Sequence, residues 1–345
     1  MSGRNEEKKM EDRVEDKIED KVMEAKHTFS RLGWCYVAGT ILLNVMHALM
    51  IPWVGRVRPE WLQNEDSRLL LSSAVVYVLA LPLIYLLARK MPSAVPEKKS
   101  IKWWQFLILF LIGYALLFVS NIMGNIVTFI IGAMKGSQVN NSLLEYVTGG
   151  SIWMMVALMV IVAPIMEELI FRKVLVDRTI RYGQGAAVAL SGLMFGLFHG
   201  NLNQFAYAVI LGVFFAFIYI KTGDIRITMG LHALMNFMGS VVAGGLLKMI
   251  HYQELLSAVE DPDRLVSLVT QYATGWILYG LFFVFIMTVV ISGIVLLIVH
   301  HRKFRLEPGE VQIPAGQRIQ TLLLNPGMLF FCIMWIVMII LQLFS

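Results

Sequence analysis

The chain has 345 residues, of which 57% are hydrophobic and 15% are charged, and its formal net charge is +5. Soluble domains hold about 45–50% apolar and about 25% charged residues, so an ordinary soluble enzyme and a disordered protein are both excluded. Most basic residues lie between apolar runs, which excludes a nucleic-acid surface and indicates membrane orientation instead. Cys35 and Cys332 lie inside apolar runs and predict neither a disulfide framework nor a metal site of the Cys-x-x-Cys kind.

The most charged part of the chain is segment 1–31, which holds eight Lys or Arg and nine Asp or Glu. Within it, Val14, Ile18 and Val22 recur every four residues among acid–base pairs, which predicts a charged helix over 6–29. We interpret this helix as a solvated segment on the cytoplasmic side. A short coiled coil and a helix on the membrane surface are the alternatives that the pattern leaves open.

Nine apolar segments follow, and each is a candidate membrane span because about 20 apolar residues cross a bilayer. The fifth of them is short for a span. The sequence therefore predicts an all-α fold: a polytopic membrane helix bundle with about nine transmembrane helices, preceded by the charged helix. The nine segments are 33–54, 69–88, 104–133, 152–176, 186–199, 204–220, 226–247, 273–299 and 326–344.

The loops between these segments carry an uneven share of the basic residues. With the N-terminus inside and alternating spans, the inner connections hold 23 Lys and Arg and the outer ones hold 6. This asymmetry is what the positive-inside rule expects. We therefore expect an integral, multi-pass protein of a membrane such as the bacterial cytoplasmic membrane, with its N-terminus inside and its C-terminus outside.

The fourth segment carries a Glu-Glu-x-x-x-Arg motif in a region that should face lipid. Ionisable groups inside a span are costly and usually face a cavity or a partner. Glu168 and Arg172 are four residues apart on one helix face, so they can pair. Adjacent helical residues point about 100° apart, so Glu167 turns to another face and can act as a base. The alternative is that both glutamates lie among headgroups at the inner end of the helix.

Two further segments carry histidine. Glycines recur every four residues from Gly192 to Gly200, which predicts a close helix contact beside His199. In the seventh segment, His232 and Asn236 are four residues apart, so their side chains share one stripe and can donate hydrogen bonds to one point. Ordinary packing is the alternative for the first histidine, and a polar contact between helices is the alternative for the pair.

A carboxylate, two imidazoles and an amide thus fall on three nearby segments within 70 residues. This set can hydrolyse a peptide bond: the carboxylate takes a proton from water, an imidazole orients that water or protonates the leaving nitrogen, and the other donors hold the oxyanion. The remaining polar residues of the first and third segments are interpreted as contacts between helices. They are Asn44, His47, Asn121 and Asn125.

The expected depths of His199 and His232 in the membrane do not agree with a common site. Segment 186–199 rises about 20 Å, whereas His232 lies only about 9 Å from the start of its own segment. His199 and His232 are therefore expected to meet only if the helices tilt or if the fifth segment begins below the membrane edge.

The three motifs, in this order and on membrane spans, resemble the signature of the CPBP family. That family groups type II CAAX prenyl endopeptidases with bacteriocin-processing and immunity proteins. The resemblance covers about residues 150–247. The motifs are Glu167-Glu168-x-x-x-Arg172, Phe195-x-x-x-His199 and His232-x-x-x-Asn236.

The resemblance implies an intramembrane glutamate protease. It implies that Glu167 activates water together with His199, that His232 and Asn236 form the oxyanion site, and that the ion pair of the first motif supports the helix. A carboxylate with two imidazoles is also the ligand set of a catalytic zinc site. We expect no metal and no cofactor, because the two histidines lie on different segments, without the i, i+4 pair of histidines that zinc proteases use. The implied partners are the lipid bilayer and a membrane-associated peptide or protein substrate, with lipidated substrates among the candidates. No nucleic-acid partner is expected.

The resemblance also divides the chain into four parts. Segment 1–31 is the charged cytoplasmic part, 32–149 holds the first transmembrane helices, 150–247 is the catalytic core, and 248–345 holds the last transmembrane helices. Two other functions stay open: a non-catalytic scaffold or immunity protein of the same fold, and a proton-coupled transporter. A transporter is expected to show inverted repeats, which we do not find in the sequence.

Overall fold

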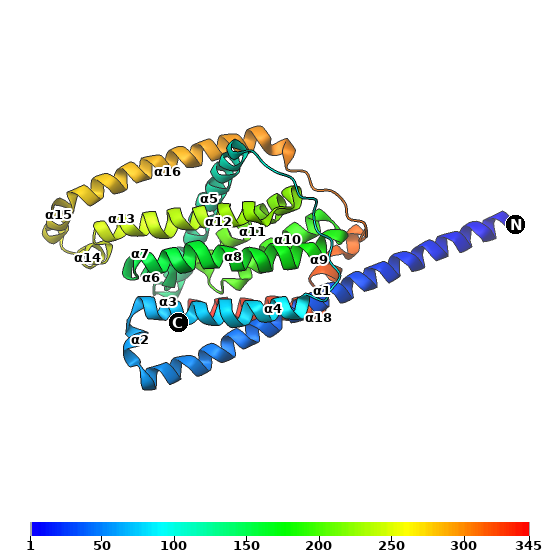
Figure 1. Cartoon of the computed structure of the whole chain (residues 1–345), viewed down its shortest axis with the longest axis horizontal. Helices are drawn as coiled ribbons and strands as arrows, with labels where there is room; N and C mark the ends of the chain where they lie inside the picture. The colour runs from blue at the N-terminus through cyan, green and yellow to red at the C-terminus, as the bar shows by residue number, and fades with distance from the viewer. Residues whose placement is uncertain (1, 345) are drawn as a thin grey trace.

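The computed structural model describes residues 2–344, with side chains described from Asp16 onward. Every regular element in this part of the chain is a helix, and the protein is an integral, multi-pass membrane bundle, so the predicted all-α fold class is confirmed (Figure 1). The principal α-helices are α1 (Ser2–Val57), α3 (Glu65–Ala74), α4 (Leu81–Ala88), α5 (Trp103–Lys135), α6 (Ser142–Gly149), α8 (Ala163–Glu168), α9 (Leu175–Thr179), α10 (Gln184–Phe198), α11 (Leu202–Thr222), α12 (Ile225–Asn236), α13 (Ala243–Met249), α16 (Ala273–His300) and α18 (Pro326–Leu343).

Short elements complete the chain. Four of them are π-helical stretches that continue a neighbouring α-helix, so that several helices join into one span. The π-helical stretches are η1 (Val75–Ala80), η2 (Val156–Val162), η3 (Leu169–Val174) and η5 (Phe237–Val242). The remaining short helices are α2 (Pro59–Gln63), α7 (Ile152–Met155), η4 (Ile180–Tyr182), α14 (Tyr252–Ser257), α15 (Pro262–Gln271), η6 (His301–Lys303), η7 (Ala315–Gln317) and α17 (Arg318–Leu322).

The predicted count of about nine spans needs a correction. Among the described residues, 8 helices are long and apolar enough to cross a membrane, whereas α10 has only 15 residues. At 1.5 Å per residue, α10 is about 22 Å long, shorter than the hydrocarbon core of a bilayer. It nevertheless reverses the direction of the chain between its neighbours, so the N- and C-termini lie at opposite ends of the bundle (Figure 1).

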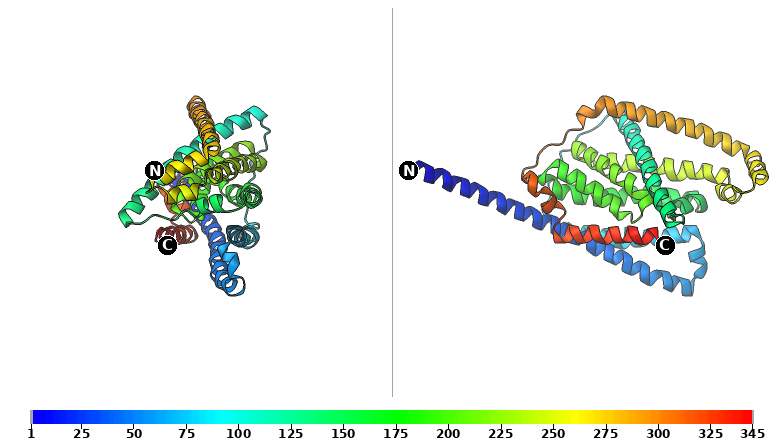
Figure 2. Two further views of the ribbon diagram at one scale, coloured as in Figure 1. Left: turned by 90° about the vertical axis from the view of Figure 1, so that its left-hand side faces the viewer. Right: turned by 180° about the vertical axis from the view of Figure 1, so that it is seen from behind.

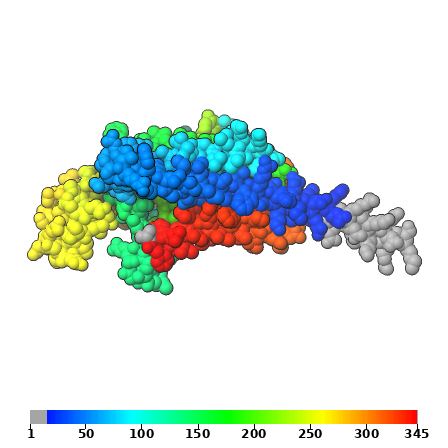
Figure 3. Space-filling model, turned by 90° about the horizontal axis from the view of Figure 1, so that it is seen from below, coloured from blue at the N-terminus to red at the C-terminus, as the bar shows by residue number. Residues whose placement is uncertain are grey.

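The charged N-terminal segment and the first span form one continuous helix, α1, of 56 residues. The backbone of 6–29 is helical, as predicted, whereas the side chain of Val14 lies outside the described ones. Figure 3 shows α1 and α18 side by side along one face. They touch closely because Gly33 meets Gly327: a Cβ on Gly33 would come within 2.3 Å of the Gly327 carbonyl carbon.

The connections predicted to lie inside gather at one end of the bundle, which we call the basic end. Backbone hydrogen bonds join them: Ala94 N donates to Asp177 O over 2.6 Å, and Lys99 N donates to Thr222 O over 2.6 Å. At the opposite end, the backbone N–H of Ser151 donates to Asp66 Oδ1 over 2.6 Å. The helices therefore alternate as the charge asymmetry predicts.

Two apolar cores hold the bundle together. One packs α1, α4, α10 and α18 around side chains such as Phe171 and Phe195. The other packs α5, α11, α12 and α16 around Phe215 and Leu231. Helix α5 crosses the bundle obliquely, as Figure 2 shows from behind. The predicted motifs lie where the two cores meet.

Candidate active site

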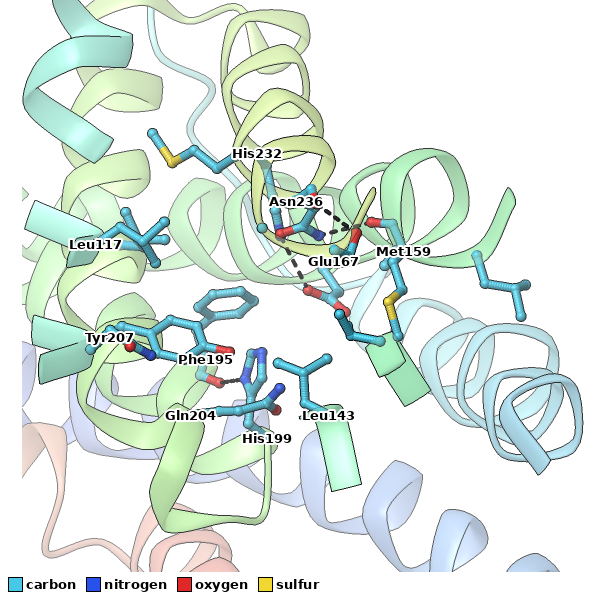
Figure 4. Close-up of a pocket in the computed structure, with 18 of the residues that line it drawn as sticks. Leu117, Leu143, Met159, Glu167, Phe195, His199, Gln204, Tyr207, His232 and Asn236 are labelled. Carbon is cyan, nitrogen blue, oxygen red and sulfur yellow. Dashed lines mark hydrogen bonds and ion pairs between the residues drawn. The ribbon is translucent and has the colours of Figure 1, made fainter. Parts of the chain in front are cut away.

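A cavity of about 530 Å³ lies between the two cores (Figure 4). Four of the six predicted site residues line it: Glu167, His199, His232 and Asn236. They come from α8, from the end of α10 and from α12. Segments far apart in the chain therefore bring their polar side chains to one place.

The other two predicted residues, Glu168 and Arg172, are not among the residues that line the cavity. Arg172 Nε is 3.0 Å from Glu168 Oε2, and both side chains are 0% exposed. This is the i, i+4 pair that the spacing predicts. The Arg172 guanidinium also lies over the Phe195 ring, 4.6 Å from its centroid. A charge is tolerated in a buried position only when an opposite charge compensates it, so Glu168 and Arg172 each stabilise the buried charge of the other.

Glu167 turns away from this pair, as the helix geometry predicts, and its side chain is 14% exposed. Its Oε1 accepts a hydrogen bond of 2.9 Å from the hydroxyl of Tyr77. Its Oε2 lies 3.8 Å from Nε2 of His232. The carboxylate is thus oriented by a hydrogen bond at Oε1, while Oε2 faces His232 and the side chain keeps access to the cavity.

His232 connects the two glutamates. Its Nδ1 lies 3.1 Å from Glu168 Oε1, and its Nε2 faces Glu167. The ring also stacks on Phe215, with 5.5 Å between the centroids. Because Nδ1 can donate to Glu168, the buried ion pair fixes the orientation of the imidazole that meets the cavity.

π-Helical turns flank these side chains. Glu167 and Glu168 lie in α8 between η2 and η3, Tyr77 lies in η1, and Asn236 directly precedes η5. Single π-helical turns inside α-helices are frequent at functional sites. The wider turns change which residues share a face, and a pattern of 3.6 residues per turn cannot predict that change.

His199 closes the C-terminal end of α10. Its Nδ1 lies 2.8 Å from the carbonyl oxygen of Phe195, which can accept only if that nitrogen carries the proton. The neutral ring then presents an unprotonated Nε2. The predicted glycine contact holds α10 against α11: a Cβ on Gly192 would meet Val213 Cγ2 at 2.5 Å, and one on Gly196 would meet Val209 Cγ2 at 2.3 Å.

The expected strain between the depths of His199 and His232 is resolved at Phe195. The Phe195 ring lies 4.8 Å from the His199 ring and 5.9 Å from the His232 ring, measured between centroids. The two imidazoles therefore flank one aromatic side chain at the cavity. The predicted meeting of His199 and His232 at one cavity is therefore found.

Asn236 lines the same cavity, with its amide nitrogen donating to Met159 O over 2.8 Å. An amide nitrogen carries two hydrogens, so this bond orients the group and leaves a second donor. The contacts expected from other polar residues are partly wrong. The amides of Asn44 and Asn125 bond within their own helices, to Thr40 O and Asn121 Oδ1.

Sequence reasoning missed several polar residues of the cavity. Tyr77 comes from the second span, Asn121 from α5, and Gln204 and Tyr207 from the start of α11. Asn121 is among the residues expected to contact a neighbouring helix, and the other three belong to no recognised motif. The one signal that could have found them is a polar group inside an apolar run.

A carboxylate and two imidazoles could also hold a zinc ion, with Glu167, His199 and His232 as the candidate ligands. Among the described side chains, no group of three His, Cys, Asp or Glu residues is arranged to hold a metal ion. The contacts of His232 fit this finding, because both of its nitrogens face glutamate oxygens.

Comparisons with known proteins agree with the position of the cavity. Residues 149–238 match the model of a family described as type II CAAX prenyl endopeptidase Rce1-like. The chain is 25% identical over 213 residues to a Bacillus subtilis (strain 168) protein named "Putative membrane peptidase YdiL"; the aligned part is 59% of this chain and 85% of that protein. No solved structure matches the chain. The resemblance to the CPBP family is confirmed, and both similarities support a membrane peptidase as the general class.

Proposed function

We propose that this membrane protein is an endopeptidase that hydrolyses a peptide bond of a membrane-associated peptide or protein inside the bilayer, with Glu167 as the general base. The observation that carries the proposal is the meeting of three separated motifs on one cavity within the bundle. The Glu167 carboxylate is oriented by Tyr77 and keeps access to that cavity, which is the arrangement that a base needs.

The first step is the activation of water. Glu167 takes a proton from a water molecule, and the Nε2 lone pair of His199 orients that water by accepting its second hydrogen. The water oxygen then attacks the carbonyl carbon of the peptide. When the carbon–nitrogen bond breaks, the proton held by Glu167 passes to the leaving nitrogen. Positioned proton transfer of this kind contributes about 10²–10⁴ in rate.

The charge that develops on the carbonyl oxygen needs hydrogen-bond donors. Asn236 supplies the second N–H of its amide, and His232 supplies Nε2–H when its ring is protonated. The positive charge of that ring faces Glu168 at Nδ1 and the charge that develops on the carbonyl oxygen at Nε2. Donors fixed before the reaction stabilise the oxyanion without reorganisation.

Comparative peptidomics of membranes tests this function and identifies the substrate. Cells that carry the wild type are compared with cells that carry Glu167→Gln, and Glu260→Gln is the matched control because Glu260 is exposed between α14 and α15. We expect peptides whose cleavage is lost with Glu167→Gln and kept with Glu260→Gln. A non-catalytic scaffold predicts identical peptides in all three membranes.

A further inference from the structure

We infer that the cavity receives its peptide from the end of the bundle opposite to the basic end, so that the substrate is a segment in the outer half of the bilayer. This inference rests on the proposed function, because it names the side from which the substrate of that site arrives. It rests on three structural observations and on the charge asymmetry of the loops.

The first observation is the position of the lining residues along their helices. Ser73 lies eight residues from the start of the span Glu65–Ala88, which begins at the end opposite to the basic end. Gln204 lies two residues from the start of α11 at that same end. Leu143 and Val147 come from α6, which packs against α3 and α13 at that end; a Cβ on Gly244 of α13 would meet Val147 Cγ1 at 2.5 Å. The cavity therefore extends away from the basic connections.

The second observation is the packing on the basic side of Glu167. Glu168 directly follows Glu167, and it pairs with Arg172 four residues further along the span; both side chains are 0% exposed. Phe171 and Phe215, both 0% exposed, pack on the same side. The buried charged pair and the two aromatic side chains together block the passage of a peptide on this side. Separating the pair to let a peptide through would leave buried charges without partners.

The third observation is the short hairpin of α10 and α11. Its turn lies beside Gly124 of α5, where a Cβ would come within 3.2 Å of Ala206 and 3.6 Å of Asn203 O. Helix α5 continues for eleven residues to Lys135, which is about 16 Å further at 1.5 Å per residue. The hairpin thus ends below its neighbour, and beyond its turn the cavity is lined by Leu143 and Val147 of α6.

The charge asymmetry identifies the two sides. The connections with most of the basic residues are expected in the cytoplasm, so the end towards which the cavity extends is the extracytoplasmic one. Most lining side chains are apolar, among them Leu69, Leu117, Phe118 and Leu158, so the peptide next to the scissile bond is apolar as well. A hydrophilic C-terminal tail in the cytoplasm would approach the packed side instead.

Cysteine accessibility in intact spheroplasts tests this inference. The probe is a membrane-impermeant sulfonated maleimide, and the background is Cys35→Ala with Cys332→Ala. Gly239 lines the cavity, and Gly316 lies in the connection at the basic end; a Cβ at either glycine meets nothing within 4 Å. Gly239→Cys and Gly316→Cys are therefore a matched pair that the fold accommodates.

We expect Gly239→Cys to react in intact spheroplasts as fast as after permeabilisation, and Gly316→Cys to react at least tenfold faster after permeabilisation. Labelling of Gly239→Cys only after permeabilisation, or from neither side, overturns the inference. The labelling needs no turnover, so it is repeated with Glu167→Gln and should be unchanged. Failure of the proposed function would appear separately, as peptide cleavage that survives Glu167→Gln.

Discussion

The hydroxyl of Tyr77 donates a hydrogen bond to Oε1 of Glu167 over 2.9 Å, and it joins the second span to the proposed base. The two residues are 90 positions apart, and Tyr77 lies outside the segment 149–238 that matches the family model. The orientation of the carboxylate thus depends on a part of the chain beyond the recognised motifs.

Tyr77→Phe should lower kcat by about tenfold with little change in KM, because it removes the bond that orients Glu167 and leaves the ring in place; this corresponds to about 1.4 kcal/mol. Tyr207→Phe is the matched control, since Tyr207 lines the same cavity but its hydroxyl bonds to Gln204. Steady-state kinetics of both variants in proteoliposomes is the measurement. Equal losses in the two variants would contradict a specific role for Tyr77.

The buried ion pair of Glu168 and Arg172 should make a large contribution to the stability of the fold. Glu168→Gln leaves the charge of Arg172 without its partner, and breaking a fully buried pair costs about 3–5 kcal/mol. The double variant Glu168→Gln with Arg172→Met removes both charges, so we expect it to unfold at a higher temperature than Glu168→Gln alone. Thermal unfolding in detergent measures both. A double variant less stable than the single one would show that Arg172 has other essential contacts.

The fold class and the pairing of Glu168 with Arg172 could be predicted from the sequence, because both leave periodic signals. Apolar runs predict the spans, and the i, i+4 spacing predicts the pair of Glu168 and Arg172. Span number was less predictable, because a 15-residue helix such as α10 can reverse the chain without the length of a span. Tyr77 could not be found, since its contact depends on how two distant spans pack.

A pH effect should arise at Asp224, which caps α12 at the basic end by accepting from Arg226 N over 3.1 Å. Hydrogen bonds from the Arg226 side chain, together with its charge, hold the pKa of the Asp224 carboxyl well below its usual range. A lowered pKa in the folded state stabilises the protein above the usual value near 3.9, and this stability is lost as the pH falls through the folded value.

Asp224→Asn should therefore destabilise the protein by on the order of 1 kcal/mol at pH 5–8, with the difference shrinking below about pH 4. Asparagine keeps the cap but loses the charge. Thermal unfolding of the wild type and the variant across this pH range is the measurement. A difference that grows on acidification would show that the ion pair is not its source.

Metal removal should leave the activity unchanged. His199 and His232 come from different helices, without the i, i+4 pair of histidines that zinc proteases carry on one helix. We expect protein that is stripped with a strong chelator, and shown to be metal-free by elemental analysis, to keep its full rate. Activity that disappears on stripping and returns with stoichiometric zinc would make Glu167, His199 and His232 metal ligands.

The role of Glu167 as general base is tested most directly by the cleavage rate of purified Glu167→Gln in proteoliposomes, using a substrate found by peptidomics. Glutamine keeps the size of the side chain but cannot take a proton, so we predict a loss of about 10²–10⁴ or more, with an unfolding temperature close to that of the wild type. Glu260→Gln should cleave at the wild-type rate. A Glu167→Gln variant that folds normally and cleaves within about fivefold of the wild type would contradict the proposed mechanism.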